Sequence, residues 1–181
     1  MRNNPERLAW TVLLAAFAAF VALAIGIPAA ISSVINQSTV GAAAYVRLQA
    51  GRIQTYSPPA TERDARVVSL EGRDVEEGST IIVDPDASSQ GLLTISPAGA
   101  REPLLSALAY SGARIQIWRA TSPRFTISRA RDEVMLIMSA GRAQFTVRPR
   151  EARGASVTIL TPYGYFNLGE GIFTVEVAAG E

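Results

Sequence analysis

The stretch LAWTVLLAAFAAFVALAIGIPAAI, residues 8–31, decides how this chain is organised, because none of its 24 side chains is charged. A helix rises about 1.5 Å per residue and the hydrocarbon core of a bilayer is roughly 30 Å thick, so a helix of this length spans a membrane. Seven residues precede the run, and a block of about one domain's length follows it. The sequence therefore predicts a cytoplasmic tail over 1–7, a transmembrane helix over 8–31, a juxtamembrane linker over 32–43 and one domain over 44–181.

The charges that flank the span predict its orientation. Arg2 and Arg7 precede it with only Glu6 against them, whereas the first charge after it is Arg47. Positive residues within about 15–20 residues of a span keep that end in the cytoplasm. We therefore expect a single-pass bacterial cell-membrane protein with a cytoplasmic N-terminus and an extracytoplasmic C-terminal domain.

A cleaved signal peptide is the alternative to this anchor, with the small residues 42–44 as its cleavage site. The apolar region of a signal peptide is about 7–15 residues long. The run at 8–31 is longer, which favours an anchor that is kept.

Small residues recur every four positions along the span, at Ala18, Ala22, Gly26 and Ala30, and so share one helix face. Such a stripe lets two helix backbones approach closely in lipid. It predicts a helix-packing face for a protein partner or a second copy of the chain. The alternative is chance, because 9 of the 24 residues are alanine.

The composition excludes several classes of site. The chain has no cysteine and no histidine, which removes thiolate chemistry, the usual general base and the commonest metal ligand. Its carboxylates, such as Asp84 and Asp86, lie in turn-like stretches where solvated acids are the norm. The net charge is +1, unlike that of a nucleic-acid binder. We expect a non-enzyme without metal or cofactor.

After residue 44 the pattern becomes alternating, with short β-branched and aromatic runs between Gly, Pro, Asn, Asp and Ser clusters. This is typical of an all-β domain. It predicts a jelly-roll-like sandwich of about a dozen short strands. The candidate strands are 45–48, 52–56, 66–70, 80–83, 92–96, 104–110, 113–119, 124–128, 134–139, 142–148, 156–160, 163–168 and 172–177.

One of these strands is expected in the centre of a sheet. Residues 134–139, VMLIMS, are apolar on both faces. The small residues 139–141 that follow predict a turn, so that 134–139 and 142–148 would form a hairpin.

Charge is uneven within the domain. Residues 57–112 carry four arginines against nine acids, and residues 113–153 carry nine arginines against three acids. The simplest interpretation is that the two halves neutralise each other. The alternative is a basic face that includes Arg114, Arg119 and Arg124 and binds an anionic envelope polymer, lipid headgroups or an acidic partner.

An aromatic cluster, Tyr163, Tyr165 and Phe166, is the most binding-like feature of the sequence. Gly164 and Gly169 flank its rings in a predicted turn. We expect at least two of the rings to pack in the core, with an exposed binding surface as the alternative.

Short motifs across 45–177 resemble the FecR-like domain, a β-rich extracytoplasmic module of bacterial signal-transducing regulators. The segments that carry the resemblance are LQAGRI (48–53), GRDVEEGSTI (72–81), GARI (112–115), SAGRA (139–143), TPYG (161–164) and GIFTV (171–175). The resemblance implies a jelly-roll-like β domain. Regulators of this family also place a helical domain that engages a sigma factor before the span, for which residues 1–7 have no room, and they have Gly-Thr where this chain has Gly171-Ile172.

These observations predict a membrane-anchored, non-catalytic binding or scaffolding protein with a FecR-like domain. One alternative is a single-span accessory subunit that stabilises a larger membrane complex. The other is a module that binds a cell-envelope polymer or carbohydrate.

Overall fold

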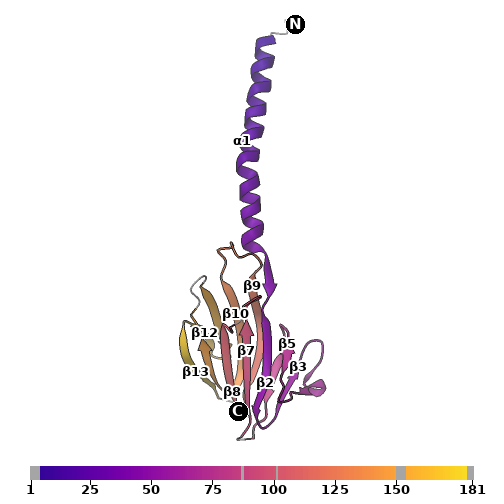
Figure 1. Cartoon of the computed structure of the whole chain (residues 1–181), viewed down its shortest axis with the longest axis vertical. Helices are drawn as coiled ribbons and strands as arrows, with labels where there is room; N and C mark the ends of the chain where they lie inside the picture. Colours follow the sequence, from indigo (N-terminus) through magenta and orange to yellow (C-terminus); the bar gives the residue numbers. More distant parts are fainter. Residues whose placement is uncertain (1–4, 87, 101, 150–153, 179–181) are drawn as a thin grey trace.

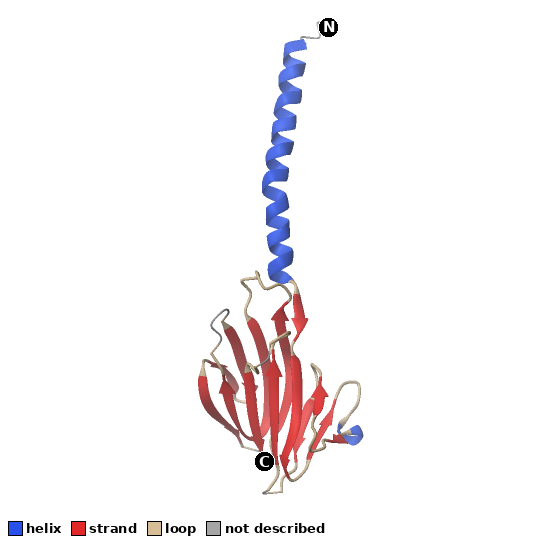
Figure 2. Ribbon diagram, viewed as in Figure 1, coloured by secondary structure: helices blue, strands red, loops and turns tan. Residues whose placement is uncertain are grey.

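A computed structural model describes residues 5–86, 88–100, 102–149 and 154–178 of the chain. One long helix, α1 (Pro5–Gln37), projects from one end of a β domain (Figures 1 and 2). All the strands among the described residues belong to this domain. Its apolar part is long enough to cross a membrane, and none of it is buried within the protein. The predicted division into one N-terminal apolar helix and an all-β domain is confirmed.

Thirteen strands and one short 3-10 turn follow α1 in the described residues. Their bounds are β1 Thr39–Gly41, β2 Ala43–Ala50, β3 Ile53–Tyr56, η1 Glu62–Asp64, β4 Arg66–Val67, β5 Arg73–Val75, β6 Thr80–Val83, β7 Gln90–Ser96, β8 Leu105–Tyr110, β9 Arg114–Pro123, β10 Asp132–Val147, β11 Ala155–Thr161, β12 Gly164–Leu168 and β13 Gly171–Val177.

The strands form two layers, which we call sheet A and sheet B. Sheet A has the order β4-β3-β6-β9-β10-β11-β12, and β1 pairs with the last three residues of β9. Sheet B has the order β5-β2-β7-β8-β10-β13. All pairs are antiparallel except β10 with β11, which is parallel.

Strand β10 belongs to both sheets. Up to Ala140 it pairs with β9 and β11 in sheet A, and from Gly141 onward it pairs with β8 and β13 in sheet B. The predicted hairpin at 139–141 is therefore wrong, although the central position of 134–139 is confirmed. The small residues 139–141 allow β10 to bend at this point. The pairing with β9 shifts register between Met138 and Ala140, and Gly141 has a φ of +84°. An added Cβ at Gly141 would lie 2.5 Å from the Ala113 nitrogen.

The core lies between the two sheets and uses the alternation that the sequence shows. Ile115 and Ile117 of β9 and Phe145 of β10 are fully buried, while their neighbours Arg114 and Gln116 are partly exposed. Burial of one side chain in two along each strand is what period-2 patterning predicts. This confirms the expected sandwich.

One local prediction is wrong near the helix. Residues 124–128, expected as a strand, form bends and a turn in which the Ser128 N–H donates to the Phe125 carbonyl. The segment 32–43, predicted as a juxtamembrane linker, contains the end of α1, all of β1 and the first residue of β2, so that only Ser38 and Ala42 lie outside a regular element. The sequence pattern also missed β1 and β5, which are three residues long and show little alternation.

Candidate interaction surfaces

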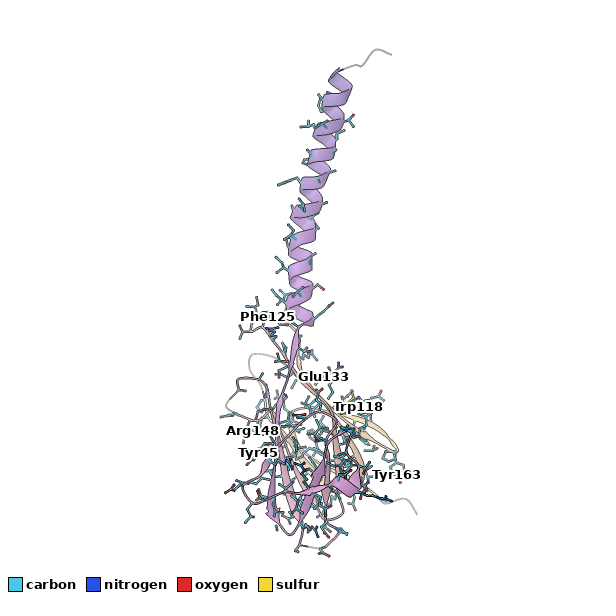
Figure 3. All side chains as sticks on the ribbon, turned by 90° about the vertical axis from the view of Figure 1, so that its right-hand side faces the viewer. Tyr45, Trp118, Phe125, Glu133, Arg148 and Tyr163 are labelled. Atoms are coloured by element: carbon cyan, nitrogen blue, oxygen red, sulfur yellow. The ribbon has the colours of Figure 1, made fainter. Side chains whose placement is uncertain are left out.

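The aromatic cluster is exposed. Tyr163, in the turn before β12, is 72% exposed, and in β12 itself Tyr165 is 72% and Phe166 is 49% exposed. The expectation that at least two rings pack in the core is wrong. Figure 3 shows Tyr163 at the surface of the domain, well away from the end that meets α1.

The register of β12 explains this exposure. Phe166 lies opposite Ile159 of β11, and directly opposite side chains in an antiparallel pair point to the same face. Ile159 is completely buried, so Phe166 also faces the inner side of sheet A, yet half of it remains accessible. Sheet B therefore does not cover this end of β12, although it does cover Leu168 at the other end.

β12 is also an open edge. Within the described residues it pairs on one side only, with β11. Its backbone groups on the other side are left for a further strand, and an exposed edge is a template for pairing with another chain. Strand addition, in which an extended segment of a partner pairs with a sheet, uses an unpaired edge of this kind.

The three candidate arginines do not form one surface. Arg114 pairs with Glu62 of η1 at 3.0 Å, and Arg119 pairs with Glu133 of β10 at 3.6 Å. Arg124 follows the opposite end of β9, where its guanidinium carbon lies 5.9 Å from the centre of the Phe125 ring. Ten extended residues separate Arg114 from Arg124, or roughly 30 Å. Two of the three positive charges are thus matched by glutamates.

Charged residues of both signs line one pocket of about 260 Å³, formed around β3, η1, β4 and β5. Asp64 and Asp74 line it together with the cations Arg66 and Arg73. The Thr61 backbone N–H, and then its hydroxyl, donate to Asp64 and lower the pKa of that carboxyl. Among the described residues no group of three or more acids is arranged to hold a metal ion.

Asp84 and Asp86 occupy the turn between β6 and β7. One Asp84 carboxylate oxygen accepts the Asp86 backbone N–H at 3.2 Å, an interaction that caps the turn locally. This carboxylate has a structural role in the turn that its sequence position predicts.

The stripe of small residues in α1 faces none of the other described residues. Ala18, Ala22, Gly26 and Ala30 are all exposed, and a Cβ added at Gly26 would meet nothing within 4 Å. The stripe is thus accessible to another helix in the membrane.

One surface was missed by the sequence analysis, at the base of α1. The loop 124–131 docks there: the Asn36 side-chain oxygen accepts the Arg129 backbone N–H at 3.1 Å and the Ser128 hydroxyl at 3.3 Å. A groove of about 530 Å³ lies between Pro28–Asn36 of α1 and this loop. The sequence signal at this place is Ile127, an apolar residue between the polar residues Thr126 and Ser128, and the same pattern predicts a strand.

These features define a β-sandwich protein with one membrane-length N-terminal helix and an exposed aromatic edge strand. No family model matches the chain, and the searches of curated proteins and of solved structures find no match either. The assignment of function therefore rests on the surfaces of this chain.

Proposed function

We propose that this chain is a single-span membrane protein whose extracytoplasmic, FecR-like β domain binds a protein partner and does not catalyse a reaction. In this proposal α1 remains as an uncleaved anchor with its N-terminus in the cytoplasm. The observation that carries the proposal is the open edge of β12 with Tyr163, Tyr165 and Phe166 exposed beside it.

The chemistry of this edge suits a protein ligand. Tyrosine is enriched in the residues that dominate binding energy at protein interfaces, because it buries a large area and keeps a hydroxyl for hydrogen bonding. A partner strand would add to sheet A through main-chain hydrogen bonds, and its side chains would pack on Phe166 and the two tyrosines. The matched ion pairs of Arg114 and Arg119 favour this apolar edge over a basic face for an anionic envelope polymer.

Photo-crosslinking in the native membrane tests this proposal. A photoreactive phenylalanine analogue replaces Tyr165, and in a control chain it replaces Trp118, an aromatic residue of β9 that is 57% exposed. We expect a discrete crosslinked protein from position 165 only. Equal labelling at both positions, or none, would contradict a binding edge at β12.

Tyr165→Ser provides the matching loss-of-function variant. Because the side chain is largely exposed, the substitution leaves the core intact and stability changes by less than about 0.5 kcal/mol. A hot-spot residue removed from an interface weakens binding by about 2 kcal/mol or more, roughly thirtyfold. The assembly recovered by gentle detergent extraction should therefore lose its partner.

A second candidate function is that of an accessory subunit held in a larger complex through the span. The accessible stripe at Ala18, Ala22, Gly26 and Ala30 favours it. Gly26→Leu would then reduce co-extraction of the complex, whereas Phe17→Leu, off the stripe, would not. If only Tyr165→Ser has an effect, the partner binds at β12; if only Gly26→Leu has one, the complex is held by the span.

A further inference from the structure

The loop 124–131 between β9 and β10 has no role in the proposed partner site. It carries two exposed apolar side chains, Ile127 at 73% and Phe125 at 37%, together with three arginines, at 124, 129 and 131. The ion pairs among the described residues involve other arginines, at 114, 119 and 148. The loop therefore presents apolar side chains and positive charge to the same surroundings.

The loop is fixed to the end of the span. The Asn36 side chain accepts hydrogen bonds from Ser128 and Arg129, and the Arg124 backbone N–H donates to the Ser38 carbonyl at 2.9 Å. On the other side of the junction β1 pairs with β9. Figure 3 shows Phe125 beside the base of α1. The height of the loop relative to a membrane thus follows from the position of the helix.

Counting along the helix gives that height. About 20 residues cross the hydrocarbon core, so a span that begins at Ala9 reaches its outer boundary near Pro28. Asn36 lies eight residues further on, about 12 Å along the axis. Ile127 and Arg129 line the groove with Pro28 and Ile31, so the loop turns back from Asn36 toward the boundary. Interfacial layers add about 5–8 Å on each side of the hydrocarbon, so the part of the groove from Pro28 to Ser32 lies within the headgroup layer.

We propose that loop 124–131 is a membrane-contact element that binds anionic phospholipid. Ile127 and Phe125 enter the interfacial layer of the outer leaflet, and an acyl chain lies against Pro28 and Ile31 in the groove. Arg129 lines the same groove and binds the lipid phosphate through its guanidinium. This arrangement holds the β domain at one height and tilt relative to the membrane. It leaves the β12 edge exposed, away from the end of the domain that meets α1. The inference rests on the proposed function insofar as it requires α1 to remain in the membrane.

The absence of cysteine makes a direct test available, because one introduced thiol labels one position. The full chain is reconstituted into lipid nanodiscs of phosphatidylcholine with about one-quarter phosphatidylglycerol. Ile127→Cys carries an environment-sensitive fluorophore. Tyr163→Cys is the matched control, with an exposed fraction of 72% against 73% but a position distant from α1.

We expect the label at position 127 to shift its emission to the blue and to be quenched by lipids that carry a headgroup nitroxide. The label at 163 should respond only to a water-soluble quencher. Since a basic residue near an anionic surface contributes about 1 kcal/mol, Arg129→Gln should lower the ratio of inserted to solvated label roughly fivefold with phosphatidylglycerol present. It should have little effect in phosphatidylcholine alone.

The outcomes separate the two proposals. If the chain co-migrates with nanodiscs and the label at 127 behaves like the one at 163, the anchor stands and the membrane-contact element is refuted. If the label at 127 inserts but Arg129→Gln has no lipid-dependent effect, the anionic-lipid site is refuted. If the chain does not co-migrate with nanodiscs, the anchor and the inference both fail.

Discussion

Gly141→Ala tests how β10 passes from one sheet to the other. Gly141 has a φ of +84°, which an alanine adopts at a cost of about 1–2 kcal/mol. The new Cβ would also lie 2.5 Å from the Ala113 nitrogen and closer still to its Cα. Ala113 is fully buried, and its N–H and carbonyl both take part in backbone hydrogen bonds, with Tyr110 and Val83, so it cannot move aside easily.

Overpacking of this kind adds about 1–3 kcal/mol to the conformational cost. The expected total loss in the free energy of unfolding is thus about 2–5 kcal/mol, against about 5–15 kcal/mol for a typical domain. The assay is urea unfolding of the full chain in detergent, followed by the circular dichroism of the β domain.

Gly112→Ala is the matched control. Gly112 also has a positive φ, +74°, but a Cβ there would meet nothing within 4 Å. We expect this variant to lose only the conformational contribution of about 1–2 kcal/mol. Equal losses in the two variants would refute the tight contact between the β10 bend and the β8–β9 turn.

Substitutions at three other positions probe the core and the surface. Ser122→Ala should stabilise the domain by about 1 kcal/mol in urea unfolding, because the buried Ser122 hydroxyl has no hydrogen-bond partner in the described chain; a loss of stability would show that the hydroxyl is satisfied. Phe145→Ala should cost about 3–5 kcal/mol and Phe145→Leu clearly less, since this ring is completely buried; equal effects would argue against a packed ring. Asp64→Asn should remove a small contribution to stability that is present above about pH 4 and is lost as the pH falls through the lowered pKa of Asp64. Thermal unfolding between pH 3 and 6 would detect this difference. An unchanged pH profile would mean that the hydrogen bonds from Thr61 add nothing to stability.

Local pattern was enough to predict the class of fold. The uncharged run at 8–31 is a contiguous property of the chain, and a helix satisfies its own backbone hydrogen bonds, so no tertiary contact is needed to recognise it. The alternation around Ile115, Phe145 and Ile159 likewise follows from strand geometry alone. Solvated turn acids such as Asp86 also follow from local chemistry.

Only the tertiary structure decided which segments meet. The residues 139–141 have turn-like chemistry, but pairing with β9 and then with β13, which is distant in sequence, keeps β10 extended through them. The exposure of Phe166, which faces the inner side of sheet A, depends on where sheet B ends, and no residue in β12 encodes that. The docking of loop 124–131 on Asn36 joins positions more than ninety residues apart. Periodicity reports which face a side chain occupies, whereas long-range pairing determines whether that face is covered, and so the candidate surfaces emerge only from the folded chain.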